Sequence, residues 1–164
     1  MTNEEQEIWQ KLKRFQVGDP HSSFSFADRL ARENDWSAEY ANRVIHEYKK
    51  FIFLIVKTKQ PMTPSDEVDQ AWHLHLLYTE SYWDDMCRDL LGLKINHGPT
   101  KGGGSEKAKY WELYERTKTC YREVFEHEPP ADIWPSNEVR FSNIIFTRVN
   151  RHQNWVIRKP KFLN

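Results

Sequence analysis

Apolar residues recur at helical spacing in the first part of the chain. Residues 4–16 place Ile8 and Leu12 on one side, with charged residues between them, which predicts an amphipathic helix. Ser25 is followed three positions later by Asp28, a capping pattern that predicts the start of a short second helix.

A third helix is predicted at residues 38–58, after the N-cap candidate Ser37. Its apolar stripe widens between Phe51 and Val56 into apolar residues on all sides. A helix that is apolar all round is buried. We therefore expect this helix to lie at the centre of the bundle.

A fourth helix is predicted after the sequence TPSD at residues 63–66. Thr63 is the expected N-cap, because Pro64 then takes the first helical position, where its missing N–H costs nothing. The pattern allows this helix to continue to Leu91, with Gly92 as its stop.

The last clear helix begins at Ser105 and ends before Pro129. Beyond it, Asn143–Val149 and Trp155–Arg158 suggest short strands or irregular packing. Together the patterns predict an all-α single domain, a bundle of four or five helices with a short irregular or β-hairpin C-terminal tail.

Charge divides the 164-residue chain into two parts. No acidic residue follows Glu138, so residues 139–164 carry six Lys and Arg and residues 1–138 carry the other 18 against 24 acidic groups. We expect a helical domain at 1–138 with the basic tail folded back on it; the alternative is a tail that binds a polyanion.

Composition also bears on location. No run of about 18 apolar residues is present, so no membrane span is expected. The N-terminal sequence MTNEEQEIWQ is acidic and unlike a signal peptide. Two cysteines at unrelated positions do not form a disulfide framework. These features predict a cytoplasmic protein.

Groups able to bind a metal concentrate between residues 61 and 99. Asp69 and His73 are helical i,i+4 neighbours, so their side chains can converge on one ion. His75 is two positions from His73, roughly 200° around a helix of 3.6 residues per turn, and is better explained as a hydrogen-bonded core residue. His97 lies in the following loop, which could fold back toward His73.

Cys87 is a weaker candidate. It is fourteen residues beyond His73, about 21 Å along a continuous helix, so it could join a shared site only if the chain bends. A nucleophilic Cys87 paired with His97 is an alternative.

Asp69, His73 and His97 form a two-histidine, one-carboxylate set, with His75 and Cys87 as lesser candidate ligands. Such a set suits zinc first, and also iron or manganese. An open coordination position would let the metal activate water, as in a metal-dependent hydrolase. Alternatively, Asp69 and His73 form a structural pair with no metal.

The tail supports a different function. It interleaves aromatic and basic side chains, as proteins that bind single-stranded nucleic acid do. The alternative function is therefore a non-enzymatic module that binds a protein or nucleic acid partner. Its candidate contact residues are Arg148, Arg151, Trp155, Arg158 and Lys159.

Several stretches, EYKKFIFL, PMTPSDEVDQAWHLHLLYTESYW, HGPTKGG and PPADIWP, resemble the glycine-rich domain-containing protein-like family. The resemblance covers about residues 26–135. The family's D-x-x-W-H-x-H signature is matched by Asp69, Trp72, His73 and His75. Cys87 falls where the family tends to have a cysteine, but Met86 replaces the Asp that often precedes it. The resemblance implies a helical fold and a shared histidine motif, and no established reaction.

Overall fold

The computed structural model describes residues 1–19, 21–98, 104–142, 149–150 and 152–157. Within these ranges all the elements are helices and no strand is found: α1 (Asn3–Arg14), α2 (Phe26–Asn34), α3 (Ala38–Thr58), α4 (Asp66–Leu77), η1 (Ser81–Leu90), α5 (Gly104–Phe125) and the single turn α6 (Asn137–Arg140). The predicted all-α single domain is confirmed. The described part has six substantial helices instead of four or five, because the predicted fourth helix is divided into α4 and η1.

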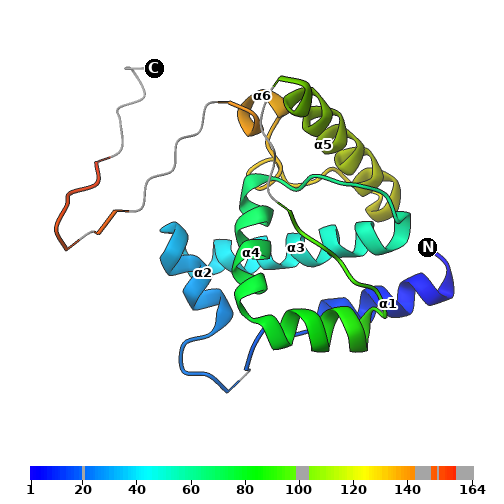
Figure 1. Cartoon of the computed structure of the whole chain (residues 1–164), viewed down its shortest axis with the longest axis horizontal. Helices are drawn as coiled ribbons and strands as arrows, with labels where there is room; N and C mark the ends of the chain where they lie inside the picture. Colours follow the sequence, from blue (N-terminus) through cyan, green and yellow to red (C-terminus); the bar gives the residue numbers. More distant parts are fainter. Residues whose placement is uncertain (20, 99–103, 143–148, 151, 158–164) are drawn as a thin grey trace.

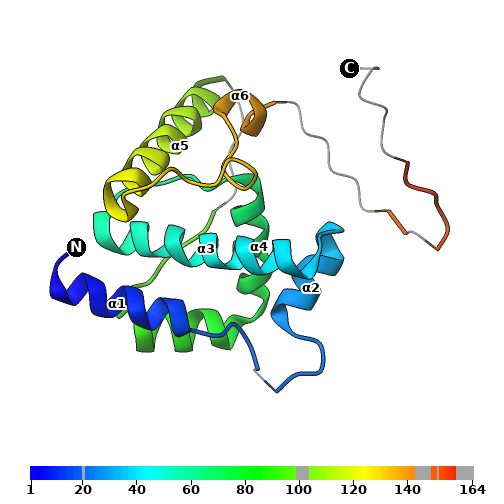
Figure 2. The ribbon, with the colours of Figure 1, turned by 180° about the vertical axis from the view of Figure 1, so that it is seen from behind.

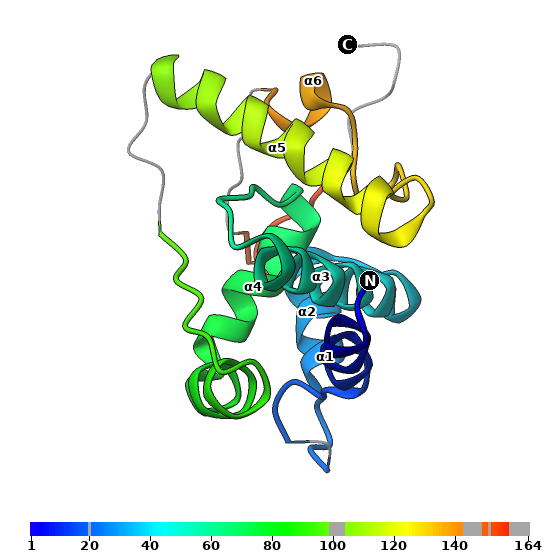
Figure 3. The same cartoon turned by 90° about the vertical axis from the view of Figure 1, so that its right-hand side faces the viewer.

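Helix α3 lies at the centre, as its all-round apolar sequence predicted. It contacts α1, α2, α4 and α5, and Figures 1 and 2 show it running between α1 and α5. Figure 3 shows these helices arranged around it. Several of its side chains are at most 1% exposed, among them those of Tyr48, Phe51, Ile52 and Leu54. Burial of such large side chains is the main favourable term in holding the helices together.

The predicted helix starts are mostly confirmed. Thr2, Ser25 and Ser37 cap α1, α2 and α3 through their side-chain oxygens. The fourth start is two residues later than predicted. Ser65 caps α4, its Oγ accepting from Val68 N at 3.2 Å, and Thr63 precedes the helix.

The predicted helix from residue 64 to Leu91 is interrupted. Tyr78 leaves helical geometry at φ −89° and ψ 65°, and the chain then forms the wider π-helix η1, which runs crosswise to α4 (Figure 1). Gly18 packs so tightly on Tyr78 that a Cβ there would lie 2.9 Å from the tyrosine ring. The helix therefore ends where the loop between α1 and α2 packs against it, which is a tertiary contact and not a local feature of the sequence.

The chain returns across the bundle through α5 and the segment after it. Trp134 is buried and its Nε1 donates to Glu47 Oε2 at 2.9 Å, which ties this segment to α3. Phe141 packs against Trp111 and Tyr114 of α5. The first residues of the predicted basic tail are thus part of the bundle surface.

The two predicted C-terminal strands fall largely outside the described residues. Positions 143–148 and Arg158 are not among them, and the described residues 149 and 155–157 are not in a strand. Of the helices the structure describes, none is both long and apolar enough to cross a membrane.

Candidate metal site

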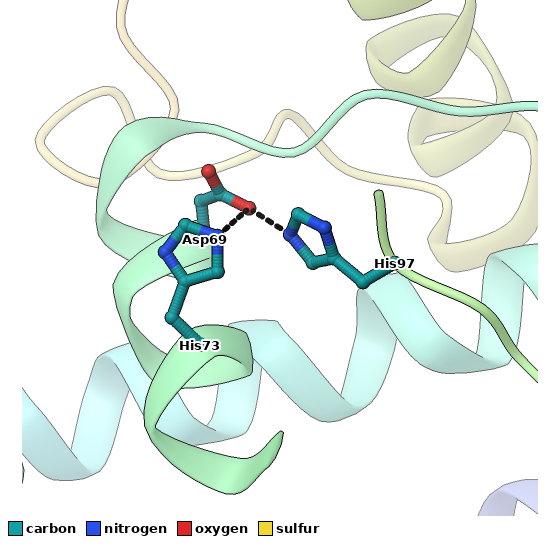
Figure 4. A group of neighbouring side chains, drawn as sticks. All are labelled: Asp69, His73 and His97. Carbon is teal, nitrogen blue, oxygen red and sulfur yellow. Dashed lines mark hydrogen bonds and ion pairs between the residues drawn. The ribbon is translucent and has the colours of Figure 1, made fainter. Parts of the chain in front are cut away.

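Three side chains from two segments meet beside the start of α4 (Figure 4). Asp69 Oδ1 lies 2.8 Å from His97 Nε2 and 3.8 Å from His73 Nε2. One ligand atom from each of the three residues lies within 4.8 Å of the others. The rings of His73 and His97 are neighbours, with their centroids 4.6 Å apart and their planes tilted by 40°.

Helix α4 supplies two of these groups on one face. Asp69 and His73 are one turn apart, so their side chains project in the same direction. The helix is fixed at its start by the Ser65 cap, and Asp69 N donates to Ser65 O at 3.0 Å. The Asp69 carboxylate is therefore held by a well-anchored first turn.

His97 is positioned by the tryptophan between the two α4 ligands. The indole of Trp72 packs on the imidazole of His97 with centroids 4.2 Å apart. Trp72 Nε1 donates to the Tyr82 hydroxyl at 2.9 Å, and that hydroxyl donates to Ile95 O at 2.7 Å. This series of hydrogen bonds anchors the loop two residues before His97.

The three groups differ in exposure. The side chains of Asp69 and His97 are 19% and 16% exposed, whereas that of His73 is 51% exposed. Partial burial reduces competition from water around the Asp69–His97 pair. The exposed His73 leaves one side of the group accessible to a small ligand.

The separations can be compared with those in a metal site. Ligand atoms of one tetrahedral zinc lie about 3.3 Å apart when each bond is about 2.0–2.1 Å. Asp69 and His97 would separate slightly and His73 would move inward to reach this geometry. Because His73 is half exposed, a rotation of its side chain meets little resistance.

His75 lies apart from this group. It is fully buried, with Nδ1 2.9 Å from the Tyr48 hydroxyl and Nε2 3.3 Å from Ser81 Oγ. Burial lowers its pKa to about 3. The structure thus places His75 in the core, where the two-residue spacing from His73 put it, and not beside Asp69.

Cys87 also lies outside the group, because η1 runs crosswise to α4. Its buried thiol is next to the Tyr82 hydroxyl and the Ile95 backbone, and burial raises its pKa. A raised pKa disfavours the thiolate that nucleophilic attack or metal binding requires. Cys87 contacts the loop that carries His97 at Leu93 and Ile95, and does not reach the other two residues of the group.

The candidate contact residues of the tail are mostly not described. Arg148, Arg151, Arg158 and Lys159 lie outside the described residues. Trp155 is described and is 93% exposed, followed by the exposed Val156 and Ile157.

Two features of the site were not foreseen from the sequence. The first is the anchoring role of Trp72 and Tyr82, for which the motif tryptophan was the available signal. The second is Arg140, which counted only as a charge of the tail. Its Nε donates to Pro64 O at 3.2 Å and its Nη1 lies 3.8 Å from Asp66 Oδ1, so it packs at the start of α4.

The fold and the site define a small helical domain that gathers two histidines and a carboxylate. Comparison with known proteins assigns its family: a family model described as UCP032817-like matches residues 20–131, and the chain belongs to this family. The function of this helical domain is unknown.

A curated relative extends this assignment and confirms the resemblance seen in the sequence. Glycine-rich domain-containing protein 1 of Arabidopsis thaliana is 27% identical over 105 residues, which cover 61% of this chain and 13% of that protein. The chain thus spans a small part of that relative's length. No solved structure matches the chain.

Proposed function

We propose that this protein is a metal-binding domain in which Asp69, His73 and His97 hold one divalent transition metal ion. The observation that carries the proposal is the convergence of three ligand atoms within 4.8 Å, from positions up to 28 residues apart in sequence. Imidazole nitrogen and carboxylate oxygen are both ordinary ligands of such ions.

Zinc is the expected ion, with iron and manganese as the other candidates. Two imidazoles and one carboxylate match the three-ligand set of zinc enzymes that keep a fourth position open. The same set is used by non-haem iron sites with open positions. The chemistry of the donors thus favours a reactive site over a closed structural one.

An open coordination position would let the metal bind water or a substrate. A bound divalent ion lowers the pKa of its water toward neutrality and polarises an oxygen of the substrate. Here the open side is that of the half-exposed His73. Metal-dependent hydrolysis is therefore the reaction class we propose, with water as the nucleophile.

Metal analysis tests the proposal directly. Protein purified without an affinity tag should contain close to one equivalent of a transition metal, or take up one equivalent of zinc after treatment with a chelator. His73→Ala and His97→Ala should lose this binding. His75→Gln, Cys87→Ala and the exposed control His21→Ala should retain it. A wild-type protein that contains no stoichiometric metal and also takes up no zinc would refute the proposal.

A change of tautomer supplies a second readout. Without a metal, His97 Nε2 donates to the Asp69 carboxylate across their 2.8 Å contact. A metal bound at Nε2 would occupy that position, so the proton of the neutral ring must move to Nδ1. The nitrogen chemical shifts of His97 should therefore change from those of the Nε2–H tautomer to those of the Nδ1–H tautomer when zinc is added, and the shifts of His75 should not change.

The exposed tail supports a second candidate function. Three consecutive apolar residues are largely exposed: Trp155 at 93%, Val156 at 64% and Ile157 at 81%. Contiguous exposed apolar side chains are typical of a surface that contacts a partner. We propose that they contact a protein or nucleic acid partner, with the basic residues around them contributing charge. Base stacking on an exposed tryptophan is a common way to bind single strands.

A truncation can test this function without damaging the bundle. Phe141 packs on α5, so the chain should be ended after Ser142. Binding of the full chain to a single-stranded oligonucleotide should weaken with salt, and both the truncation and Trp155→Ala should abolish it. If the full chain does not bind the oligonucleotide, only a protein partner remains for the tail.

A further inference from the structure

A cavity of about 1070 Å³ adjoins the candidate metal site. Asp69, Trp72 and His97 form part of its wall, so a molecule in the cavity would lie directly against two of the three proposed ligands. The volume is slightly above the range of about 300–1,000 Å³ for sites that bind small organic molecules, so it is large enough to hold one. The cavity is therefore a candidate ligand site in its own right.

The charge of the cavity wall is strongly one-sided. Among its described lining residues, two carboxylates, Asp69 and Glu106, face five cationic side chains: Lys59, Lys94, Lys107, Lys109 and Arg140. A bound divalent metal would add further positive charge. A wall of this kind raises the local concentration of anions and disfavours cations.

Arg140 is the cation best placed to hold an anion. Its side chain is 17% exposed, and the phenyl ring of Phe141 packs on its guanidinium with 5.5 Å to the ring centroid. Pro64 O takes one of its five donors, and the Asp66 contact at 3.8 Å is longer than a hydrogen bond. Counted over the residues that the structure describes, the guanidinium therefore still has N–H groups that can donate to a carboxylate or phosphate.

Arg140 is also close to the proposed metal. It pairs with Asp66, which is three residues before Asp69 on the same face of α4. Side chains at this spacing are about 5–6 Å apart at Cβ. A small molecule held by Arg140 would therefore reach the Asp69 side of the site.

The rest of the wall suits an apolar group. Met62, Trp72, Tyr110, Leu113 and Phe141 line the cavity. We propose that the cavity binds a small organic anion, whose carboxylate or phosphate is held by Arg140 and whose apolar part packs on this wall. The inference rests on the proposed metal site, because the anion would be the molecule presented to the metal.

Three probes with one apolar body separate the contributions of charge and surface. They are 3-phenylpropionate, 3-phenylpropyl phosphate and 3-phenylpropanol, titrated into metal-free protein by calorimetry. Both anions should bind at least tenfold more tightly than the alcohol, and the tighter of the two identifies the natural head group as carboxylate or phosphate. Equal affinity for the alcohol and the anions would overturn the inference.

Variants test the assignment to Arg140. Arg140→Gln should weaken anion binding about tenfold or more, because a charge-assisted fork is lost, and should leave the alcohol unaffected. Arg116→Gln is the matched control, since Arg116 is exposed on α5 and does not line the cavity. An unchanged affinity in Arg140→Gln would overturn the assignment.

Arg140 also contacts Pro64 and Asp66, so its replacement could impair folding. Lys109→Glu avoids this difficulty, because Lys109 is exposed. The substitution reverses the charge of one lining residue of the cavity. The variant should bind both anions several-fold more weakly and should bind the alcohol with unchanged affinity. Loss of affinity for all three probes alike would contradict the inference.

Zinc titration of the same protein samples keeps the two proposals apart. Charge-selective binding that depends on Arg140 in a protein that takes up no zinc refutes the metal site alone. Zinc uptake with no selectivity for the anions refutes the anion site alone.

Discussion

The indole of Trp72 lies against the imidazole of His97, with their ring centroids 4.2 Å apart, while its Nε1 is bound to Tyr82. One side chain thus contacts a candidate ligand directly and also anchors the loop that carries it. This explains why a tryptophan stands between Asp69 and His73 in the motif. Trp72 sets the position of His97, the candidate ligand that lies outside α4.

Trp72→Phe should separate these two roles. The phenyl ring still packs on His97, but the hydrogen bond to Tyr82 is lost, at a cost of about 1 kcal/mol in the free energy of unfolding. Zinc affinity should fall by about tenfold or more, as it does when a second layer of contacts around a metal site is removed. Hydrogen exchange should accelerate in residues 93–98.

Trp9→Phe is the matched control for this experiment. Trp9 is buried to a similar extent, in α1, and packs on Phe53 and Phe125. It should lose stability without any change in zinc affinity. Equal zinc affinity in Trp72→Phe and the wild type would show that the Tyr82 anchor is not needed.

Much of the fold could be predicted because its signals are local. Capping residues and helical periodicity located α1, α2, α3 and α5 from short stretches of sequence. The break at Tyr78 could not be predicted in this way. It involves Gly18, whose N donates to Ser81 Oγ at 3.2 Å across 63 residues, and no local pattern records that contact.

The site residues likewise differ in whether local sequence or tertiary contacts set their positions. The Asp69–His73 pair follows from helical spacing, which is a local property. The approach of His97 was a hypothesis from loop length, since its position depends on Tyr82 and the Ile95 carbonyl. Arg140 was assigned to the tail because charge counting does not show where a side chain packs.

The start of α4 gives a prediction that distinguishes two neighbouring hydroxyl residues. Ser65 is fully buried and caps the helix, so Ser65→Ala should destabilise the protein by about 1 kcal/mol. Thr63 Oγ1 is buried without a hydrogen-bond partner among the described residues, so Thr63→Val should be neutral or stabilising. Chemical denaturation of the two variants measures both effects. A larger loss in Thr63→Val would restore Thr63 as the cap.

A buried ion pair in the core gives a third prediction. Lys50 Nζ lies 2.9 Å from Glu47 Oε1 and donates to the Tyr121 hydroxyl at 2.6 Å, and both charged side chains are less than 10% exposed. Glu47→Ala leaves Lys50 charged without its partner and should cost about 3–5 kcal/mol. It also removes the acceptor of Trp134 Nε1.

The double variant Glu47→Ala/Lys50→Met, which differs from Glu47→Ala only at Lys50, identifies the cause of that loss. Without either charge, much of the stability should return, because the penalty arises from the unpaired ion. Glu115→Ala is the control, since the Glu115 side chain in its pair with Lys118 is 49% exposed and the pair should contribute about 1 kcal/mol or less. Equal losses in the Glu47→Ala and Glu115→Ala variants, measured by urea denaturation, would contradict this account.

His75 predicts how stability depends on pH. Burial lowers its pKa from 6.5 to about 3 in the folded state, so folding favours the neutral ring. The stabilisation is fully present above the unfolded pKa of 6.5 and is lost as the pH falls from there toward 3. Each pH unit in this window should cost about 1.4 kcal/mol.

His75→Gln isolates this contribution, because glutamine keeps hydrogen-bonding groups near Tyr48 and Ser81 but does not titrate. Between pH 7 and pH 4.5 the wild type should lose about 2–3 kcal/mol more than the variant, measured by urea unfolding with a chelator present so that metal loss does not contribute. His21→Gln should follow the wild type, since His21 is exposed. Parallel pH profiles for the wild type and His75→Gln would mean that the buried ring gains its proton without cost, against the enclosure by Tyr48 and Ser81 that the structure describes.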